Sequence, residues 1–468
     1  LINNQIKGLT VMGKFERLFS LITDARLRES TSTRAAEKNL VIASESDKSR
    51  VINAAAFRRL QQKAQVFSLE TNASVRTRLT HSIEVSQIGR YLAQEIIRAV
   101  PDEVENSISY EQKLAFSNIV ETACLLHDIG NPPFGHLGEA AIRAWFDKKC
   151  KTGSDGEDYN ELRKFDGNAQ GFRLITYLSG VDEYGLNLTA STILAFVKYP
   201  ITDSKKGLFK ADYKFSYAQA CKKASWEEGR KFPLAILMDL ADEISYCMSD
   251  LEDGLEKGVI SKYDLHKEFS DLDYPQPKDD DIYPYPFIQF KTKLINSCVQ
   301  EAAKGFIDKL DCILNGEKVD VFTEDSESKQ NLNKIKQFAR KNIYSDRNIE
   351  LIELAGAKII TGLLDSYSML LDLSQEEFDF LVVDRNSKFE KNGSEKSLDF
   401  ELRLVNTIPK SYINKYLMST NFYKDNPNNE NPSFNALRGH LLIDFISGMT
   451  DDYALEMYQF LEGIKIHG

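Results

Sequence analysis

The chain has 468 residues, which is enough for two or three conventional domains or for one large helical body with insertions. Its 59 Lys and Arg residues are outnumbered by 70 Asp and Glu residues, so the formal net charge is −11 at pH 7. This balance argues against a general nucleic-acid coat protein and against an anionic-membrane binder. An anionic ligand would need a local basic pocket.

Neither a membrane span nor an export signal is apparent in the sequence. No apolar run reaches the ~18 residues of a membrane span, and residues 1–26 lack the basic, apolar and small-residue order of a signal peptide. We therefore expect a cytoplasmic protein with no membrane partner. The six cysteines show no C-x-x-C spacing, which favours free, buried thiols in a reducing compartment.

The first two predicted helices are recognised by their apolar spacing. Residues 50–66 carry an imperfect stripe and predict an amphipathic helix: Val51, Ala55, Phe57, Leu60 and Ala64. A second stripe begins after Thr80 and places a histidine on its apolar face: His81, Val85, Ile88, Leu92 and Ile96. A lone histidine in this position is more often a hydrogen-bonded core residue than a metal ligand, so the role of His81 depends on its partners.

Residues 127–139 form the part of the chain richest in reactive side chains. They follow an apolar run, 114–126, with helical spacing, and Gly130 with the two prolines after Asn131 predicts the end of that helix. His127 and Asp128 are then adjacent on the last helical turn, where a long imidazole and a short carboxylate can converge on one ion. This pair predicts a metal site that needs ligands from elsewhere in the chain.

His136 and Glu139 are three residues apart at the start of the next predicted helix, which runs to Phe146, so their side chains should be neighbours. A helix N-terminus disfavours imidazolium and a nearby carboxylate favours it. Together these effects can hold the pKa of His136 near neutrality, as proton transfer requires. The alternative is a surface His–Glu pair of little energetic value.

A polar stripe on the predicted helix 232–255 offers a further metal ligand. Asp242, Tyr246 and Asp250 recur at intervals of four residues, which stacks two carboxylates and a phenol on nearly one face. Alone, such a stripe is more often solvated. If it points inward it needs partners, and a metal with a bound sugar would supply them.

The remaining chain predicts an all-α fold. Further helical stretches cover residues 290–314, 349–373 and 440–464, whereas strand-like alternation is scarce and no internal repeat is visible. Loops are expected at residues 150–165, 202–216, 270–286, 386–397 and 422–433, with short hairpins as an option. We expect an N-terminal segment, 1–49, a helical core, 50–260, and a helical C-terminal region, 261–468.

The pattern of His81, His127–Asp128 and Asp242 resembles the HD-domain metal-dependent phosphohydrolases, which would make residues 50–260 an HD-domain core. Six longer runs resemble the bacterial deoxyguanosine triphosphate triphosphohydrolases: Arg58–Phe67, Val75–Ser82, His127–Glu139, Phe165–Gly171, Ala241–Tyr246 and Ile446–Asp451. The chain departs from the enterobacterial members at Asp166, where they carry Glu, and in shorter segments around residues 150–165 and 202–216.

The resemblance implies four metal ligands: His81, His127, Asp128 and Asp242. Two neutral imidazoles and two carboxylates leave open positions on an octahedral ion, which suits Mn²⁺ or Mg²⁺, with Fe²⁺ or Co²⁺ as further candidates. Such an ion can polarise an α-phosphate oxygen and activate a water molecule. The resemblance also assigns the acid/base role to His136 and an orienting role to Glu139.

The substrate contacts are likewise implied by the resemblance. The triphosphate would be held by Arg78, Asn168, Lys198 and Tyr199, with Arg385 or Lys388 as a further contact. Tyr246 would stack on the deoxyribose and Asp250 would accept its 3′-hydroxyl. The base pocket would be formed by Gln65, Val66, Tyr344, Glu353 and Arg403. Glu can accept from guanine N1–H and N2–H₂, Arg can donate to O6 or N7, and Tyr can stack.

The leading functional hypothesis is cleavage of dGTP to deoxyguanosine and inorganic tripolyphosphate by attack at the α-phosphorus. One alternative is a broader dNTP triphosphohydrolase that a second nucleotide activates. A different alternative is a nucleotide or single-stranded DNA binding regulator with a vestigial metal site. The resemblance further implies a homo-oligomer, a hexamer, and basic stretches such as residues 50–63 could contact single-stranded DNA.

Overall fold

The computed structural model describes residues 13–30, 39–152, 156–201, 206–278, 285–391, 393–427 and 431–465. In these ranges the chain is predominantly helical and its sheet structure is one two-stranded hairpin, which confirms the all-α prediction. No single described helix is long and apolar enough to cross a membrane. One bent pair, residues 347–370 with 375–383, passes the length and composition test with a 100° bend between its arms.

The first half of the chain contains these helices: α2 (Leu40–Asn53), α3 (Ala55–Arg59), α4 (Arg78–Arg98), α5 (Asp102–Glu105), α6 (Tyr110–Leu126), α7 (Gly135–Thr152), α8 (Gly167–Arg173), α9 (Ala190–Phe196), α10 (Lys210–Asp212) and α11 (Ala218–Lys223). The second half contains α12 (Pro233–Glu256), α13 (Lys262–Phe269), α14 (Tyr285–Asp308), α15 (Leu310–Leu314), α16 (Glu327–Asn342), α17 (Arg347–Tyr367), α18 (Gln375–Val383), β1 (Lys388–Lys391), β2 (Ser394–Ser397), α19 (Asp399–Thr407), α20 (Lys410–Asp425), α21 (Phe434–Ser447) and α22 (Asp451–Leu461).

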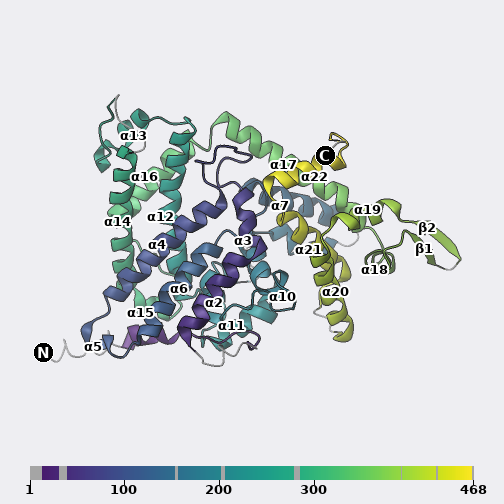
Figure 1. Ribbon diagram of the computed structural model, residues 1–468, viewed down its shortest axis with the longest axis horizontal. Coiled ribbons are helices and arrows are strands. Elements are labelled where there is room, and N and C mark those ends of the chain that lie inside the picture. The colour runs from purple at the N-terminus through teal and green to yellow at the C-terminus, as the bar shows by residue number, and fades with distance from the viewer. Residues whose placement is uncertain are drawn as a thin grey trace.

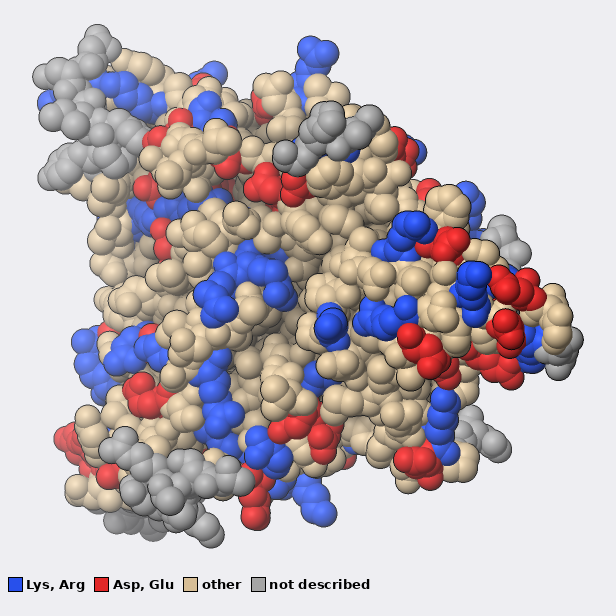
Figure 2. Space-filling model, turned by 45° about the vertical axis from the view of Figure 1, so that its right-hand side comes forward, with Lys and Arg blue, Asp and Glu red and all other residues tan. Residues whose placement is uncertain are grey.

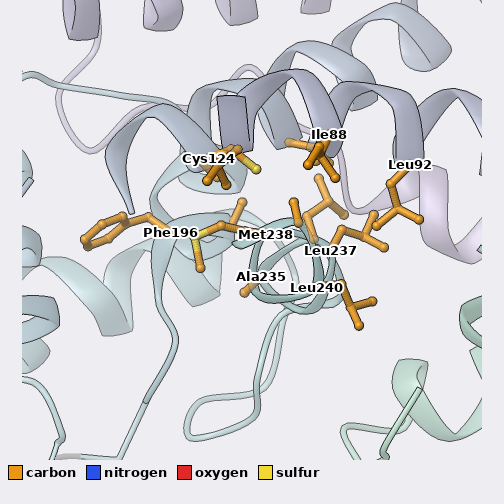
Figure 3. Close-up of a cluster of buried hydrophobic side chains, with 14 of the residues drawn as sticks. Ile88, Leu92, Cys124, Phe196, Ala235, Leu237, Met238 and Leu240 are labelled. Atoms are coloured by element: carbon orange, nitrogen blue, oxygen red, sulfur yellow. The ribbon is translucent and has the colours of Figure 1, made fainter. Parts of the chain in front are cut away.

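Helices α4, α6, α9 and α12 pack around the larger hydrophobic core. Figure 3 shows Ile88, Leu92, Cys124, Phe196 and Met238 meeting there from all four helices. Each helix buries its apolar face, and burial of that surface is the main source of stability. Local signals fix the helix starts. Thr77 with Thr80, and Ser109 with Gln112, form reciprocal capping boxes ahead of α4 and α6.

A second hydrophobic core lies under α7, α17 and the C-terminal helices α18–α22. In Figure 1 α17 runs along the top of the molecule from the larger body to this second region, and the β1–β2 hairpin projects at the far right. Helix α17 packs on α7 and α22 in the second core, and its Ile349 belongs to the larger core, so it connects the two. The larger core includes residues from both sides of position 260, and the division into 50–260 and 261–468 stays a prediction.

Three predicted helices are interrupted in the structure. The expected helix over 50–66 breaks at Ala54, whose backbone is extended, and the following turns end at Gln62. The stretch 290–314 is divided at Lys309. The stretch 440–464 is divided between Ser447 and Asp451, because the Thr450 side chain caps α22. The sequence-predicted loop at 386–397 forms the β1–β2 hairpin.

Candidate metal centre and active site

His127 lies one residue beyond α6 and caps its C-terminus with helical dihedral angles. Its Nδ1 is 2.7 Å from the carbonyl oxygen of Cys124, and because a carbonyl can only accept, Nδ1 carries the proton. The proton-free Nε2 is therefore available as a ligand atom. This nitrogen is buried and has no hydrogen-bond partner among the described residues.

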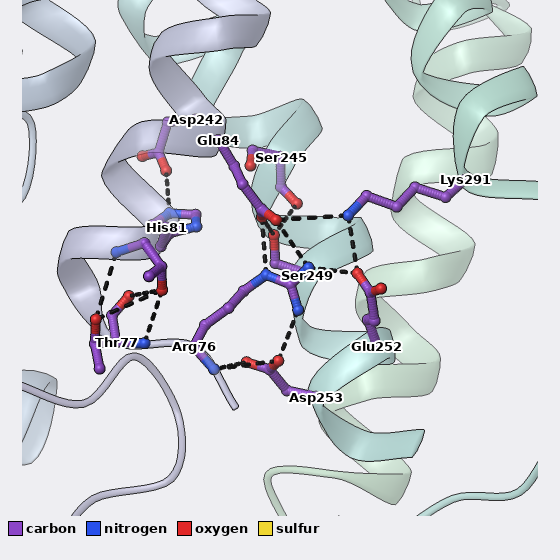
Figure 4. A network of polar contacts seen from close by, with 11 residues as sticks. Arg76, Thr77, His81, Glu84, Asp242, Ser245, Ser249, Glu252, Asp253 and Lys291 are labelled. Carbon is purple, nitrogen blue, oxygen red and sulfur yellow. Dashed lines mark hydrogen bonds and ion pairs between the residues drawn. The ribbon is translucent and has the colours of Figure 1, made fainter. Parts of the chain in front are cut away.

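His81 on α4 and Asp242 on α12 bring two more predicted ligands close to His127. His81 is fully buried and neither of its ring nitrogens has a hydrogen-bond partner among the described residues. Asp242 Oδ1 lies 3.5 Å from His81 Nε2 and 3.5 Å from His127 Nε2. Figure 4 shows the His81 ring and the Asp242 carboxylate facing each other across the two helices. Buried nitrogens left without partners in this way are suited to a cation.

Asp128 brings the fourth predicted ligand to the same point. Its Oδ2 is 3.6 Å from His127 Nε2, and one ligand atom each from His81, His127 and Asp128 lie within 4.8 Å of one another. Arg78 Nη1 donates to Asp128 Oδ2 at 2.5 Å, and Asn131 Nδ2 donates to Oδ1 at 2.6 Å. The structure therefore brings all four predicted ligands together, and their donor set fits a divalent ion.

Both carboxylates of this cluster are held in the ionised form. Burial alone would raise the pKa of Asp242, but Lys198 and His127 hold it well below its usual range. Arg78 likewise outweighs burial and lowers the pKa of Asp128. Two negative charges thus face the buried imidazoles, which matches the charge of a divalent cation.

His136 and Glu139 form the predicted pair at the start of α7. His136 Nδ1 is 3.3 Å from Glu139 Oε2, which confirms that the two side chains are neighbours. The His136 side chain is 91% exposed, whereas that of Glu139 is 7% exposed and accepts from the amide of Gly167 at 2.8 Å. The hydrogen bond with Glu139 raises the pKa of His136 against a smaller opposing effect of burial. A fixed carboxylate therefore orients an imidazole that solvent can reach.

Arg78 links this pair to the metal cluster. Gly135 has a φ of +56°, and a Cβ atom there would lie 2.9 Å from Arg78 Nη2. A glycine is therefore needed where α7 begins, both for its conformation and for the close approach of the guanidinium. Arg78 stands between Asp128 and the first turn of α7, where an anionic substrate would meet it.

Two residues that sequence reasoning did not assign hold the loop between Asp128 and α7. Buried Lys63 donates to the carbonyl oxygens of Asn131 and Ser447 at 2.6 and 2.7 Å. Asp451 accepts from the amides of Ala64 and Phe134, both at 3.1 Å. These bonds join three of the sequence runs that resemble the triphosphohydrolases. Lys63 and Asp451 both lie in such runs, and this was the only signal in the sequence that could have identified them.

Lys198 reaches the metal cluster from the segment after α9. Its Nζ donates to Asp242 Oδ2 at 2.8 Å and lies 3.2 Å from Asp239 Oδ1, while Lys231 also pairs with Asp239. The neighbouring Tyr199 is 38% exposed. Lys231 and Asp239 were not predicted as site residues, although Asp239 stands one helical turn before Asp242. Lys198 thus contacts the predicted ligand Asp242, and Lys231 lies one carboxylate further away on Asp239, so two positive charges are available where a polyphosphate would require them.

The predicted sugar contacts lie together on α12, and Tyr344 joins them from the turn before α17. The Tyr344 hydroxyl donates to Asp250 Oδ2 and lies 2.5 Å from the Tyr246 hydroxyl. The rings of Tyr246 and Tyr344 are stacked, with centroids 6.5 Å apart. Burial raises the pKa of Asp250 to about 7. Asp250 Oδ1 has no hydrogen-bond partner among the described residues, so it offers an acceptor to a hydroxyl.

An ion-pair network beside His81 fixes α4 against α12 (Figure 4). Arg76 donates to both carboxylate oxygens of Glu84 at 2.8 Å and to Asp253 Oδ1 at 2.7 Å, and it also pairs with Glu252. Lys291 donates to Glu252 at 2.9 Å. These contacts set the position of residues 77 and 78 relative to the Asp250 end of α12.

Comparison with known proteins agrees with this geometry. The HD domain model matches residues 78–246. A deoxyguanosinetriphosphate triphosphohydrolase of Klebsiella pneumoniae (strain 342) is 33% identical in an alignment that covers 92% of this chain and 95% of the relative. One of the same description from Yersinia pestis (strain Pestoides F) is 33% identical, with 89% and 93% covered.

The chain belongs to the family of deoxyguanosinetriphosphate triphosphohydrolases. It is an HD-domain hydrolase and, at that level of description, a metal-dependent nucleotide triphosphohydrolase. HD domains bind divalent metals, and the cluster of His81, His127 and Asp128 is able to hold one. The identity of the ion and the roles of individual side chains are taken up below as proposals.

Three further residues expected from the family resemblance border the site. A short bridge between Ala64 and Thr77 places Gln65 and Val66 beside the start of α4. Gln65 Oε1 is buried without a hydrogen-bond partner among the described residues, and Val66 packs on the larger core. Asn168 stands at the start of α8, next to the Gly167 amide that bonds Glu139, and its Nδ2 donates to Asp166 Oδ1 at 2.5 Å.

The structure does not bring the other expected base contacts together. Glu353 lies on an exposed part of α17, where partial burial and Glu350 raise its pKa and His136 opposes this rise. Arg403 lies on α19 and donates to the carbonyl oxygen of Asp399. Helix α19 packs on α18 at the opposite end of the second region (Figure 1). No contact within the described chain joins Arg403 to Glu353 or Tyr344. Arg385 bonds Asn406, and Lys388 begins the hairpin.

Proposed function

We propose that this protein hydrolyses dGTP to deoxyguanosine and inorganic tripolyphosphate by attack of water at the α-phosphorus. The observation that carries the proposal is the convergence of His81, His127, Asp128 and Asp242. Three buried imidazole nitrogens of this cluster have no hydrogen-bond partner in the part of the chain that the structure describes. The relatives are described as deoxyguanosinetriphosphate triphosphohydrolases, which supports deoxyguanosine triphosphate as the substrate.

The four ligands would hold Mn²⁺ or Mg²⁺, with Fe²⁺ or Co²⁺ as further candidates. Bound there, such an ion would polarise the α-phosphate and lower the pKa of a water molecule. The chain contributes the contacts that hold the ligand side chains in place. The Cys124 carbonyl fixes the tautomer of His127, and Arg78 and Asn131 orient Asp128. Arg78, Lys198, Tyr199 and Asn168 would bind the triphosphate, and Lys231 adds a second ammonium group next to Lys198.

His136 would act as the general acid. When water attacks the α-phosphorus, the bond to the 5′-oxygen of deoxyguanosine breaks and that oxygen needs a proton. His136 is exposed on the substrate side and is hydrogen-bonded through Nδ1 to Glu139, so Nε2 can carry the transferred proton. The hydrogen bond with Glu139 raises the pKa of His136, so its acid form persists to higher pH than that of an unpaired histidine.

The deoxyribose would lie against Tyr246, with its 3′-hydroxyl on Asp250. The Asp250 Oδ1 atom, which has no hydrogen-bond partner among the described residues, would provide the acceptor, and the bulk of the Tyr246 ring would exclude a 2′-hydroxyl. GTP should therefore be a poor substrate. For the base we propose Gln65 and Val66 as one wall and Glu353 as the acceptor for guanine N–H groups. Arg403, the donor expected from the resemblance, lies on α19 away from these residues and is not part of this proposal. The hexameric state and single-stranded DNA binding also stay predictions.

The test is to incubate the purified protein with each dNTP and with GTP, in Mn²⁺ or Mg²⁺, and to separate the products by ion-exchange chromatography. Deoxyguanosine with intact tripolyphosphate, formed chiefly from dGTP, is the expected result. Equal turnover of all dNTPs would contradict the guanine contacts and favour the broader enzyme. No turnover under any combination would favour a nucleotide-binding regulator.

Glu353→Ala tests the base contact separately. A buried polar group left unpaired costs ~1–3 kcal/mol, so the native dGTP-to-dATP preference should be about one to two orders of magnitude and should shrink in this variant. Glu350→Ala, one turn earlier on the exposed start of α17, is the matched control. An unchanged dGTP-to-dATP ratio in Glu353→Ala would remove Glu353 from the pocket.

A further inference from the structure

A cavity of about 550 Å³ lies apart from the metal cluster, between the turn at residues 182–184, the π-helical turn Tyr213–Tyr217 and the end of α20. Helices α10 and α20, which both contribute to its lining, lie near each other in Figure 1. None of its lining residues is a proposed metal ligand or substrate contact. The lining that matters here consists of Asp212, Arg173, Glu183, Phe215, Phe422 and Tyr423.

Asp212 is the unusual member of this lining. It is 6% exposed, its Oδ1 lies 3.5 Å from Arg173 Nη1, and its Oδ2 is buried without a hydrogen-bond partner among the described residues. Arg173 faces Asp212 through Nη1 alone, because its Nε and Nη2 are bonded to Asp444 at 2.9 to 3.1 Å. An unpaired buried carboxylate oxygen is costly unless a donor reaches it.

The walls of the cavity are aromatic and its charge is negative. Phe215 and Phe422 are 41% and 46% exposed and meet edge to face at 5.4 Å, and Tyr423 lies beside them. Ring faces attract cations. Asp212 and Glu183 give two negative charges against the one positive charge of Arg173, which Asp444 already neutralises. Among the described lining residues an anion would find no uncommitted cation.

We propose that this cavity is a second ligand site, for an organic cation with an ammonium group and a flat apolar body. The ammonium group donates to the Asp212 carboxylate, and the apolar body lies against Phe215, Phe422 and Tyr423. Burial raises the pKa of Asp212 to about 6, so at neutral pH the carboxylate is mainly ionised and attracts a cation. The proposal goes beyond the hydrolysis of dGTP and does not rest on it.

Two small probes of the same shape test the charge requirement on the full-length protein. Isothermal titration calorimetry would compare 2-phenylethylammonium chloride with the neutral 2-phenylethanol. A charged hydrogen bond is worth enough to give the cation at least ~10-fold tighter binding. Absence of binding by both probes, or equal binding of the two, would overturn the proposal.

Three variants locate the bound probe. Asp212→Asn keeps the shape of the side chain and should abolish the preference for the cation, whereas Asp311→Asn, an exposed aspartate on α15, should leave it intact. Asp250→Asn should also leave it intact, because the Asp250 pocket is the other place where a carboxylate faces aromatic rings. Thermal unfolding would confirm that each variant is folded. A preference that survives in Asp212→Asn, or disappears in Asp250→Asn, would refute the site.

Discussion

The metal cluster and the Arg76 network are neighbouring polar regions on the same two helices, α4 and α12, and they differ in how far their polar atoms are paired (Figure 4). In the Arg76 network the guanidinium contacts Glu84, Glu252 and Asp253. In the metal cluster both nitrogens of His81 and one of His127 lack hydrogen-bond partners within the described ranges. A paired network fixes geometry, whereas buried groups left unpaired beside ionised carboxylates indicate a ligand that completes them.

The largest effect should come from removing a ligand of the unpaired cluster. Asp242→Ala deletes the carboxylate that faces both imidazoles, so bound metal and turnover should fall by at least ~100-fold. Metal content by atomic spectroscopy and initial rates would measure this. Asp253→Asn, on the same helix but in the paired network, is the control and should keep its metal. Full metal content with normal turnover in Asp242→Ala would defeat the assignment.

The next largest effect separates catalysis from metal binding. His136→Ala should lower kcat by ~10²–10⁴-fold while metal content and substrate affinity are kept, because His136 transfers a proton and lies outside the ligand set. His266→Ala, on α13, is the matched control. Steady-state kinetics with a parallel metal assay would decide the matter, and a wild-type kcat in His136→Ala would rule out the acid role.

A change in the paired network should affect stability rather than metal binding. Arg76→Met leaves Glu84, Glu252 and Asp253 without their common partner, and removal of one member of a buried ion pair costs ~3–5 kcal/mol of unfolding free energy. Urea unfolding of the metal-free protein would measure this loss. If Arg76→Met loses metal as completely as Asp242→Ala, the distinction between the two regions is wrong.

The smallest expected effect is a shift in pH dependence. Because Glu139 raises the pKa of His136 above its usual value of 6.5, the acid form persists to higher pH and kcat should fall as pH rises through the raised value. Glu139→Gln removes that stabilisation, so the falling limb should move to lower pH. Glu161→Gln, which alters the separate Glu161–His440 pair, should leave the pH profile of kcat unchanged. An unmoved limb in Glu139→Gln would show that Glu139 does not tune His136.

The surface charge is mixed, in keeping with the acidic total. Figure 2 shows Lys and Arg side chains gathered near the middle of one face and acidic side chains more abundant towards its right-hand end. A polyanionic substrate therefore depends on local cations such as Arg78 and Lys198, which lie against Asp128 and Asp242. The overall charge of the chain does not report on its site.

Local periodicity was enough to predict the elements that carry the chemistry. The stripe from His81 to Ile96 became α4, and the three-residue spacing of His136 and Glu139 became a contact of 3.3 Å. Periodicity failed where an apolar stripe continued through a break. Ala54 fits the helical pattern around it, so the spacing of the apolar residues did not predict its extended backbone.

Contacts between distant parts of the chain could not be predicted from the spacing of residues within one helix. Tyr344 and Asp250 are 94 residues apart, and their hydrogen bond depends on how the turn before α17 meets α12. Lys231 was missed for the same reason, because its pairing with Asp239 follows from the turn that leads into α12. The resemblance named Arg403, yet the fold places it on α19, where it bonds its own helix.

The bond between the Ala64 amide and Asp451 spans 387 residues. During synthesis all four proposed metal ligands leave the ribosome long before Asp451 does, so the loop that presents His136 lacks its support until α22 has been made. A nascent chain or one truncated before α21 would hold the ligand side chains but not the bonds from Asp451 and Ser447 that steady this loop. The loop before α7 can therefore reach this bonded arrangement only after synthesis has passed Asp451.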